Sequence, residues 1–386
     1  MPMRCKTSFT GVLLAFFWLL LATTAPANSA GPSIVVDVKT GSVLEHNQAF
    51  QRWYPASLTK LMTAYVVFRQ IQSGKLTLQS PVTMSAIAAK EPPSKMYYKP
   101  GSQLSLDNAM KIILVKSAND VSVAIAESVA GSHERFVQMM NAEAKRLGML
   151  DSRFVNANGL PGKGQRTTAR DMAVLGVALM RDFPQYAHYF AIEAISTGKK
   201  TYSNYNILIG RFAGANGMKT GFICASGFNQ VSSATRNGRT VVSVVFGAAS
   251  QEERAEESAR LLNKGLTTGT LAKPSLYSMR PYGDKRSRIA DISSSICTPA
   301  ARKKRYEGRD VEGKMVLNSN YINSMNRQAK AVRVGLSGRI PAALTRGNIP
   351  VPRPRPDQIE SAGSPVAASA FKPTFDVPVP ISRPSL

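Results

Sequence analysis

The chain places β-rich segments near both ends of a long helical middle, and this arrangement restricts its fold more than any other feature. Residues 33–44 predict two short strands, rich in β-branched side chains and joined by a turn. Residues 228–235 and 240–246 predict two more strands, joined at Asn237-Gly238, a strong hairpin signal. Strands at both ends of a helical middle predict one antiparallel sheet with helices packed against it, an α+β fold.

The middle of the chain has helical periodicity. From Ser57 onward, Leu61, Tyr65 and Phe68 follow one another at spacings of four and three residues. Further helices are predicted by the helical spacing of later apolar residues, by capping boxes at Thr168 and Ser250 and by a C-terminal glycine at Gly148. These helices are residues 121–129, 136–147, 169–180 and 251–265.

The first thirty residues have the three parts of a secretory signal. Arg4 and Lys6 precede an apolar run over residues 11–22, and small residues suited to cleavage follow. This run is short for a membrane-spanning helix, which needs about 20 apolar residues. We therefore expect residues 1–30 to be a cleaved signal peptide and the protein to be exported to the periplasm or cell envelope, with retention as an N-terminal anchor as the alternative.

The composition changes near residue 275. Residues 276–386 hold 19 basic and 8 acidic residues and 12 of the 23 prolines. Alternating prolines favour extended polyproline II conformations and resist packing into a core. We predict a folded domain over residues 31–275 and a mostly disordered, Pro-rich basic tail over residues 276–386, with short helices or strands between residues 313 and 345.

The net charge of +25 would suit a nucleic-acid-binding protein. Export removes DNA and RNA as routine partners. The charge is then expected either to face an anionic envelope, with the basic tail as a peripheral contact, or only to aid solubility.

A serine and a lysine one helical turn apart form the first candidate site. Ser57 and Lys60 lie at a spacing of three, which on a helix places the hydroxyl and the ammonium on one face. A serine alcohol needs a neighbouring base to become a nucleophile. A lysine can serve when burial or nearby cations lower its pKa. The same spacing at Ser196 and Lys199 is interpreted as a loop.

Two further motifs follow along the chain. Ser117 and Asn119 could offer a hydroxyl for proton relay and an amide for a substrate carbonyl, or they could simply cap the helix at Val121. Lys219-Thr220-Gly221 offers a cation, a hydroxyl and room for close backbone approach. The same three residue types at Lys39-Thr40-Gly41 lie in a predicted hairpin turn and are interpreted as structural.

The order Ser-x-x-Lys, Ser-x-Asn, Lys-Thr-Gly resembles the penicillin-recognising serine enzymes. Three segments are most similar to the D-alanyl-D-alanine carboxypeptidases, the low-molecular-weight penicillin-binding proteins of peptidase family S11. These segments are PASLTKLMTAYVVF, SANDVSVAIAE and GMKTGFICASGFNQVSSA. The resemblance covers about residues 31–270 and implies a β-lactamase/transpeptidase-like fold.

The resemblance also implies a role for each residue of the motifs. Ser57 would be the acylated nucleophile and Lys60 its base, with Ser117 relaying protons and Asn119 lining the site. Lys219 and Thr220 of the Lys-Thr-Gly motif, which Gly221 completes, would hold the substrate's terminal carboxylate, with Arg254 nearby. The N–H groups of Ser57 and Phe222 would form the oxyanion hole, where family members often have His in place of Phe222.

The implied reaction removes the last D-Ala from a peptidoglycan pentapeptide through an acyl-enzyme, and β-lactams would inhibit it covalently. Three alternatives remain open. A class A β-lactamase would need a Glu before the Lys-Thr-Gly strand, and residues 150–180 contain none. A D,D-endopeptidase would use the same chemistry, and a cell-wall binding protein would keep the fold without turnover.

No cofactor or metal is expected. His46, His133 and His188 are far apart in the sequence, which does not favour a metal site. Beyond the signal, the chain keeps Cys224 and Cys297, and two positions do not define a disulfide. We expect two unpaired, partly buried thiols, with Cys224 as a packing residue.

Overall fold

The computed structural model describes residues 31–284, 286–307 and 317–339. Its main element is a five-stranded sheet with the order β2-β1-β9-β8-β7, in which every neighbouring pair is antiparallel. The strands are β1 (Ser33–Asp37), β2 (Val43–Asn47), β7 (Ala215–Ile223), β8 (Gly227–Arg236) and β9 (Arg239–Ala248). Because β1 pairs with β9, the two ends of the domain meet in one sheet, as the sequence predicted.

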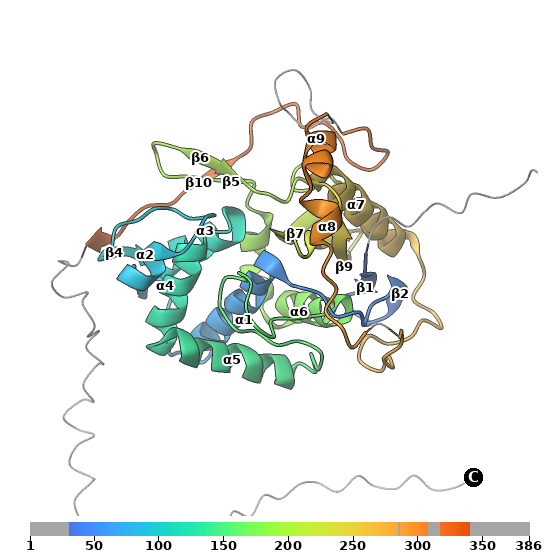
Figure 1. The fold of residues 1–386 in the computed structure, drawn as a ribbon, viewed down its shortest axis with the longest axis horizontal. Coiled ribbons are helices and arrows are strands. Elements are labelled where there is room, and N and C mark those ends of the chain that lie inside the picture. Colours follow the sequence, from blue (N-terminus) through green and yellow to red (C-terminus); the bar gives the residue numbers. More distant parts are fainter. Residues whose placement is uncertain (1–30, 285, 308–316, 340–386) are drawn as a thin grey trace, which may run out of the picture. The chain divides into compact units, whose positions relative to one another are not determined.

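Both faces of this sheet are covered. Successive strand residues point to opposite faces, so Val35 and Val245 pack toward α7 (Gln251–Thr267), whereas Ile34 and Val244 pack into the larger helical core. Figure 1 shows α7 on one side of the strands and the helical cluster on the other. The α+β prediction is confirmed.

The helical cluster is built around α1, whose residues Thr59–Phe68 are all buried. The N-caps of α6 and α7 follow the sequence signals: the Thr168 hydroxyl accepts a hydrogen bond from the Asp171 N–H, and the Ser250 hydroxyl accepts one from the Glu253 N–H. The cluster consists of α1 (Thr59–Gln72), α2 (Ala86–Lys90), α3 (Leu106–Val115), α4 (Asn119–Ala130), α5 (His133–Arg146), α6 (Ala169–Asp182) and the 3-10 helix η2 (Pro184–Ala191).

Two small three-stranded sheets join distant parts of the chain. Each takes its last strand from the segment after residue 317, and both of these strands lie within the predicted 313–345 interval. One sheet contains β3 (Pro81–Thr83), β4 (Ser102–Ser105) and β11 (Gly338–Arg339), and the other contains β5 (Ala194–Ser196), β6 (Thr201–Ser203) and β10 (Ala331–Arg333).

The segment after residue 275 is more ordered than predicted over the residues that the structure describes. It forms α8 (Ser293–Ile296) and α9 (Pro299–Glu307), and Leu276, Ile296, Ile322 and Val334 are buried. The sequence did not reveal this order, because these side chains pack on partners far away in the chain. Residues 308–316 and 340–386 lie outside the described residues, so the disordered tail remains a prediction for them.

The expectation of two free thiols is wrong. Cys224, just after β7, and Cys297, at the end of α8, form a disulfide with a Cα–Cα distance of 5.6 Å. The Ile292 N–H also donates to the Ala225 carbonyl, so α8 is held beside the β7–β8 turn by backbone as well as sulfur. The predicted signal peptide lies outside the described residues, and within those residues no helix is both long and apolar enough to cross a membrane.

Candidate active site

Ser57 lies in a short 3-10 helix, η1 (Ala56–Leu58), that leads directly into α1. Ala56 has a left-handed backbone, with φ of 46°. Such a conformation is costly for a residue with a Cβ and is found where surrounding structure enforces it. The sharp entry leaves the Ser57 side chain at the edge of a cleft, whereas Leu58, Thr59 and Lys60 are buried.

The Lys60 ammonium is fully buried behind Ser57 and makes three hydrogen bonds. Its Nζ atom lies 3.0 Å from the Ser57 Oγ, 2.9 Å from the Asn119 Oδ1 and 2.6 Å from the Asn158 carbonyl. Burial lowers the pKa of Lys60 well below its usual value, and the positive charge of Lys219 lowers it further, whereas Glu91 and Asp120 act in the opposite direction. The structure therefore favours a neutral amine next to the Ser57 hydroxyl.

The hydrogen-bond partners of Lys60 suit a proton acceptor. The amide oxygen of Asn119 and the Asn158 carbonyl can only accept, whereas the Ser57 hydroxyl can accept or donate. A neutral Lys60 would keep two N–H donors on Asn119 and Asn158 and point its lone pair at Ser57. The serine proton could then move to the amine without any rearrangement of the site.

Ser117 and Asn119 lie where α3 passes into α4. Ser117 has a left-handed φ of 61° and lines the cleft. The N-cap position of α4 is Ala118, whose methyl group cannot accept a hydrogen bond. Ser117 and Asn119 therefore do not cap the helix, which was the alternative interpretation. Asn119 accepts from Lys60 and donates from Nδ2 to the Pro92 carbonyl, which fixes the orientation of its amide.

Strand β7 forms the opposite wall of the cleft and is an edge strand of the sheet. A Cβ atom on Gly221 would lie 3.0 Å from the Ser57 nitrogen and 3.1 Å from the Leu58 nitrogen, closer than ordinary contact. Residue 221 therefore leaves little room for a side chain, because β7 runs against the backbone that carries Ser57. Thr220 and Phe222, on either side of it, line the cleft.

Lys219 is fully buried and is not among the residues that line the cleft. Its Nζ atom donates to the Thr220 carbonyl at 2.9 Å. Burial, helped by the charge of Arg254, lowers the pKa of Lys219 to about 7. Lys219 therefore lies behind the wall of the cleft, and Thr220 supplies the polar side chain at its surface.

Arg254, on α7, brings a second buried cation to the same wall. Its Nη2 atom donates to the Tyr205 carbonyl at 3.0 Å, and its Nε atom has no hydrogen-bond partner within the described part of the chain. Burial lowers the pKa of Arg254 to about 10, against the opposing effect of Glu252, so the guanidinium stays charged at neutral pH. A buried guanidinium with spare N–H donors is suited to a carboxylate.

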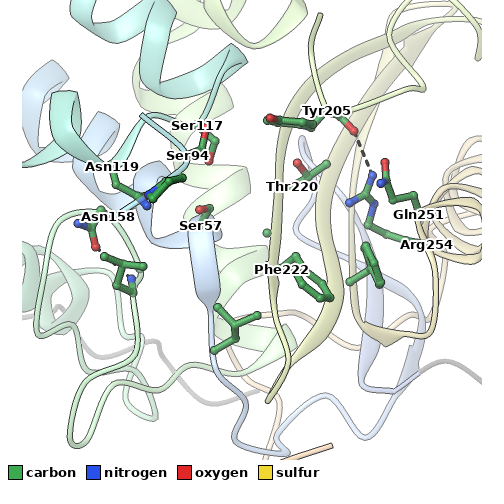
Figure 2. Close-up of a pocket in the computed structure, with 16 residues that line it drawn as sticks. Ser57, Ser94, Ser117, Asn119, Asn158, Tyr205, Thr220, Phe222, Gln251 and Arg254 are labelled. Carbon is green, nitrogen blue, oxygen red and sulfur yellow. Dashed lines mark hydrogen bonds between the residues drawn. The ribbon is translucent and has the colours of Figure 1, made fainter. Parts of the chain in front are cut away.

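Figure 2 shows how these walls face each other, with Ser117 and Asn119 on one side of Ser57 and Thr220, Phe222 and Arg254 on the other. The cleft has a volume of about 360 Å³. Each residue proposed from sequence is at this cleft or directly behind it. The lining residues are Ser57, Pro93, Ser94, Ser117, Asn119, Asn158, Gly159, Leu160, Tyr205, Thr220, Gly221, Phe222, Ile223, Phe228, Gln251 and Arg254.

Sequence reasoning missed the Asn158-Gly159 turn. The Asn158 carbonyl accepts from Lys60, and its Nδ2 donates to Glu91 at 2.8 Å. Gly159 has a φ of 87°, and a Cβ there would lie 1.8 Å from the Ala56 carbonyl oxygen. An Asn-Gly pair is a recognisable turn signal, but nothing in the sequence places that turn against Ser57.

The other candidate motifs lie elsewhere. Thr197–Lys200 form a turn between β5 and β6, and Lys39-Thr40-Gly41 form the turn between β1 and β2, as interpreted from sequence. Among the residues that the structure describes, no group of three or more His, Cys, Asp or Glu side chains is placed to hold a metal ion.

Comparison with known proteins identifies the family of this chain. Residues 21–250 match the D-alanyl-D-alanine carboxypeptidase family, peptidase S11. The chain belongs to this family. It is 38% identical over 295 residues to the D-alanyl-D-alanine carboxypeptidase DacC of Escherichia coli, an alignment that covers 72% of this chain and 74% of DacC. It is 32% identical to DacA of the same species, over 78% of this chain and 77% of DacA.

Solved structures of similar proteins share the fold of this S11 family member. Penicillin-binding protein 6B from Escherichia coli superposes with a TM-score of 0.60 at 35% identity, over 64% of this chain and 80% of that one. Penicillin-binding protein D2 from Listeria monocytogenes, solved in a cefotaxime-bound form, superposes with a TM-score of 0.57 at 28% identity, over 62% and 98% of the two chains.

Proposed function

We propose that this protein is a serine-type D-Ala-D-Ala carboxypeptidase that removes the terminal D-alanine from peptidoglycan pentapeptides. The observation that carries the proposal is the contact between the cleft-lining Ser57 and the buried Lys60, with 3.0 Å between Oγ and Nζ. A lysine with a strongly lowered pKa at hydrogen-bond distance from an accessible serine is an activated nucleophile. Membership of the S11 family supports the same activity.

In the proposed acylation step, the Ser57 Oγ attacks the carbonyl carbon of the penultimate D-Ala while its proton passes to the Lys60 amine. The negative charge that develops on the carbonyl oxygen is stabilised by the N–H groups of Ser57 and Phe222, which come from the two walls of the cleft. When the C–N bond breaks, the leaving amine takes the proton that Lys60 received, with Ser117 as the proposed relay. Water then hydrolyses the ester on Ser57.

The terminal carboxylate of the substrate is proposed to bind at the wall made by Thr220 and Arg254. Thr220 donates its hydroxyl and Arg254 its unpaired guanidinium N–H, and Lys219 adds positive charge from behind the strand. Because β7 is an edge strand, the substrate backbone can also lie along it as an added strand. This arrangement selects a free chain end over an internal peptide bond.

The compartment is proposed from two independent observations. The sequence of residues 1–30 has the layout of a cleaved signal, and the Cys224–Cys297 disulfide is of a kind that persists in oxidising compartments. We therefore infer export to the periplasm or cell envelope, where peptidoglycan is found.

A β-lactam, which resembles the D-Ala-D-Ala end, would acylate Ser57 and be released slowly.

The experiment is labelling of the purified, oxidised protein with a fluorescent penicillin, followed by digestion of a pentapeptide muropeptide. We expect one labelled band, its loss in the Ser57→Ala variant, and release of free D-Ala. Equal labelling of Ser57→Ala would refute the nucleophile. Rapid penicillin turnover would favour a β-lactamase, and faster cleavage of a cross-linked dimer than of the pentapeptide would favour an endopeptidase.

A further inference from the structure

A second hollow adjoins the proposed cleft on the side of Phe222. Its volume is about 460 Å³, and it shares Phe222, Phe228 and Gln251 with the cleft. The rest of its lining comes from the disulfide, from Glu252 and from α9. The residues that line it are Phe222, Cys224, Phe228, Gln251, Glu252, Cys297, Arg302 and Arg305.

The segment after residue 275 builds the outer wall of this hollow. The disulfide joins the end of α8 to the residue that follows β7, and α9 continues from there (Figure 1). Arg305 donates to the Ile296 carbonyl at 2.8 Å, and its guanidinium lies 5.6 Å from the centre of the Phe228 ring. The hydrogen bond joins α9 to α8, and the ring contact places α9 beside Phe228.

An aromatic floor leads from the cleft to the cations. The rings of Phe222 and Phe228 lie 4.3 Å apart, and Phe222 is 41% exposed. The Arg305 guanidinium lies over the Phe228 ring, and Arg302 lies exposed one turn earlier on α9. The hollow thus offers an apolar surface with two guanidiniums at its rim, and among the described residues that line it the Glu252 carboxylate is the one negative charge.

The order of residues along β7 determines which part of a substrate reaches this hollow. Suppose that Thr220 and Arg254 hold the terminal carboxylate and that Ser57, beside Gly221, attacks the carbonyl of the penultimate residue. The acyl part of the substrate must then extend past Phe222. Each residue of an extended peptide advances about 3.3 Å. The residue before the penultimate D-Ala therefore passes Phe222 and Cys224, directly beside α9.

We propose that this hollow is an acyl-side subsite for a side chain that ends in a carboxylate, on the residue that precedes D-Ala-D-Ala. The aliphatic part of that side chain packs on Phe222 and Phe228, and the carboxylate pairs with Arg302 and Arg305. The disulfide keeps α9 in place for this contact. The inference rests on the proposed function and adds a substrate preference to it.

The test compares two peptides of the form acetyl-Xaa-D-Ala-D-Ala, where Xaa is α-aminoadipate or the same residue with its side-chain carboxylate converted to the carboxamide. For the wild-type protein we expect kcat/KM to be roughly two- to fivefold higher for the acid, the range expected for an exposed ion pair. Added salt is expected to reduce this ratio. In Arg302→Gln the ratio falls toward one.

Lys304→Gln is the matched control, because Lys304 lies on the same helix and carries the same charge but lines a different hollow. We expect it to keep the wild-type ratio. An unchanged ratio in Arg302→Gln, or an equal fall in Lys304→Gln, would overturn the subsite. Failure of the wild-type protein to cleave either peptide would instead overturn the proposed function, and the subsite with it.

A second variant tests the role of the disulfide. Cys297→Ser removes the covalent link between α8 and β7 while leaving every charge in place. We expect the acid-to-amide ratio to fall as in Arg302→Gln, together with retained penicillin labelling, since Cys297 does not line the main cleft. A wild-type ratio in Cys297→Ser would show that α9 does not depend on the disulfide for this contact.

Discussion

Replacing Gly221 by alanine tests the close approach of β7 to the nucleophile. The added methyl carbon would lie 3.0 Å from the Ser57 nitrogen and 3.1 Å from both the Leu58 nitrogen and the Pro55 carbonyl oxygen. All three neighbours are backbone atoms of the segment that carries Ser57, so none can rotate away. The strand and η1 must separate by a few tenths of an ångström.

That separation would disturb the proposed oxyanion hole, because its two N–H donors belong to the two elements being pushed apart. Donors must lie about 2.7–3.1 Å from the oxyanion, and the loss of one costs about 10²–10³ in rate. We therefore expect Gly221→Ala to acylate about 10²-fold more slowly. Overpacking is expected to lower the free energy of unfolding by only about 1–3 kcal/mol, so the protein should remain folded.

The assay is the second-order rate constant of labelling by a fluorescent penicillin, measured together with the melting temperature. Gly269→Ala is the control, since a Cβ at residue 269 meets nothing within 4 Å. We expect that variant to label at the wild-type rate. A folded Gly221→Ala protein that also labels at the wild-type rate would refute the argument that the β7–η1 contact positions the oxyanion donors.

Three further predictions concern the lysines and the core. Lys60→Ala should remain folded but acylate roughly 10²–10⁴-fold more slowly, the usual contribution of a general base; full labelling would remove Lys60 from that role. Because the pKa of Lys219 is lowered to about 7, its cation is present below that pH and lost above it. The KM for the peptide should therefore rise as the pH passes from 6 to 9. A KM that does not change with pH would show that the charge of Lys219 does not contribute to binding. Leu261 is fully buried between α7 and the sheet, so Leu261→Ala should lower the free energy of unfolding by about 2–5 kcal/mol. Thermal unfolding and labelling measured in parallel should show a lower melting temperature at an unchanged initial labelling rate. Loss of the labelling rate in the folded variant would mean that this core layer supports the site.

The elements that sequence reasoning located well are those encoded by short-range patterns. The Asn237-Gly238 hairpin joins β8 to β9, and the Thr168 and Ser250 caps begin α6 and α7. Each depends on residues within four positions of one another, so the local sequence is sufficient. The closing of β1 onto β9 was expected from the α+β pattern, although its register, with Ile34 opposite Val244, was not.

The missed features depend on contacts between distant segments. Cys224 and Cys297 are 73 residues apart, and neither shows in the sequence which partner it takes. The order of α9 and of strands β10 and β11 comes from packing on a domain that the basic, Pro-rich composition did not suggest they would join. Composition describes what a segment can bury by itself, and it does not describe the surface that other segments offer it.

The sequence by itself indicated that Ser57 and Lys60 would meet, because a spacing of three at the start of a stretch with helical periodicity places two side chains on one face. Only the tertiary structure decided that the meeting would be chemically useful. It buried the lysine beside the charge of Lys219, supplied the Asn158 carbonyl from a remote turn, and brought β7 and Arg254 to the opposite wall. A pKa depends on the solvent and charges around a group, and these are set by segments that the chain brings together only when it folds.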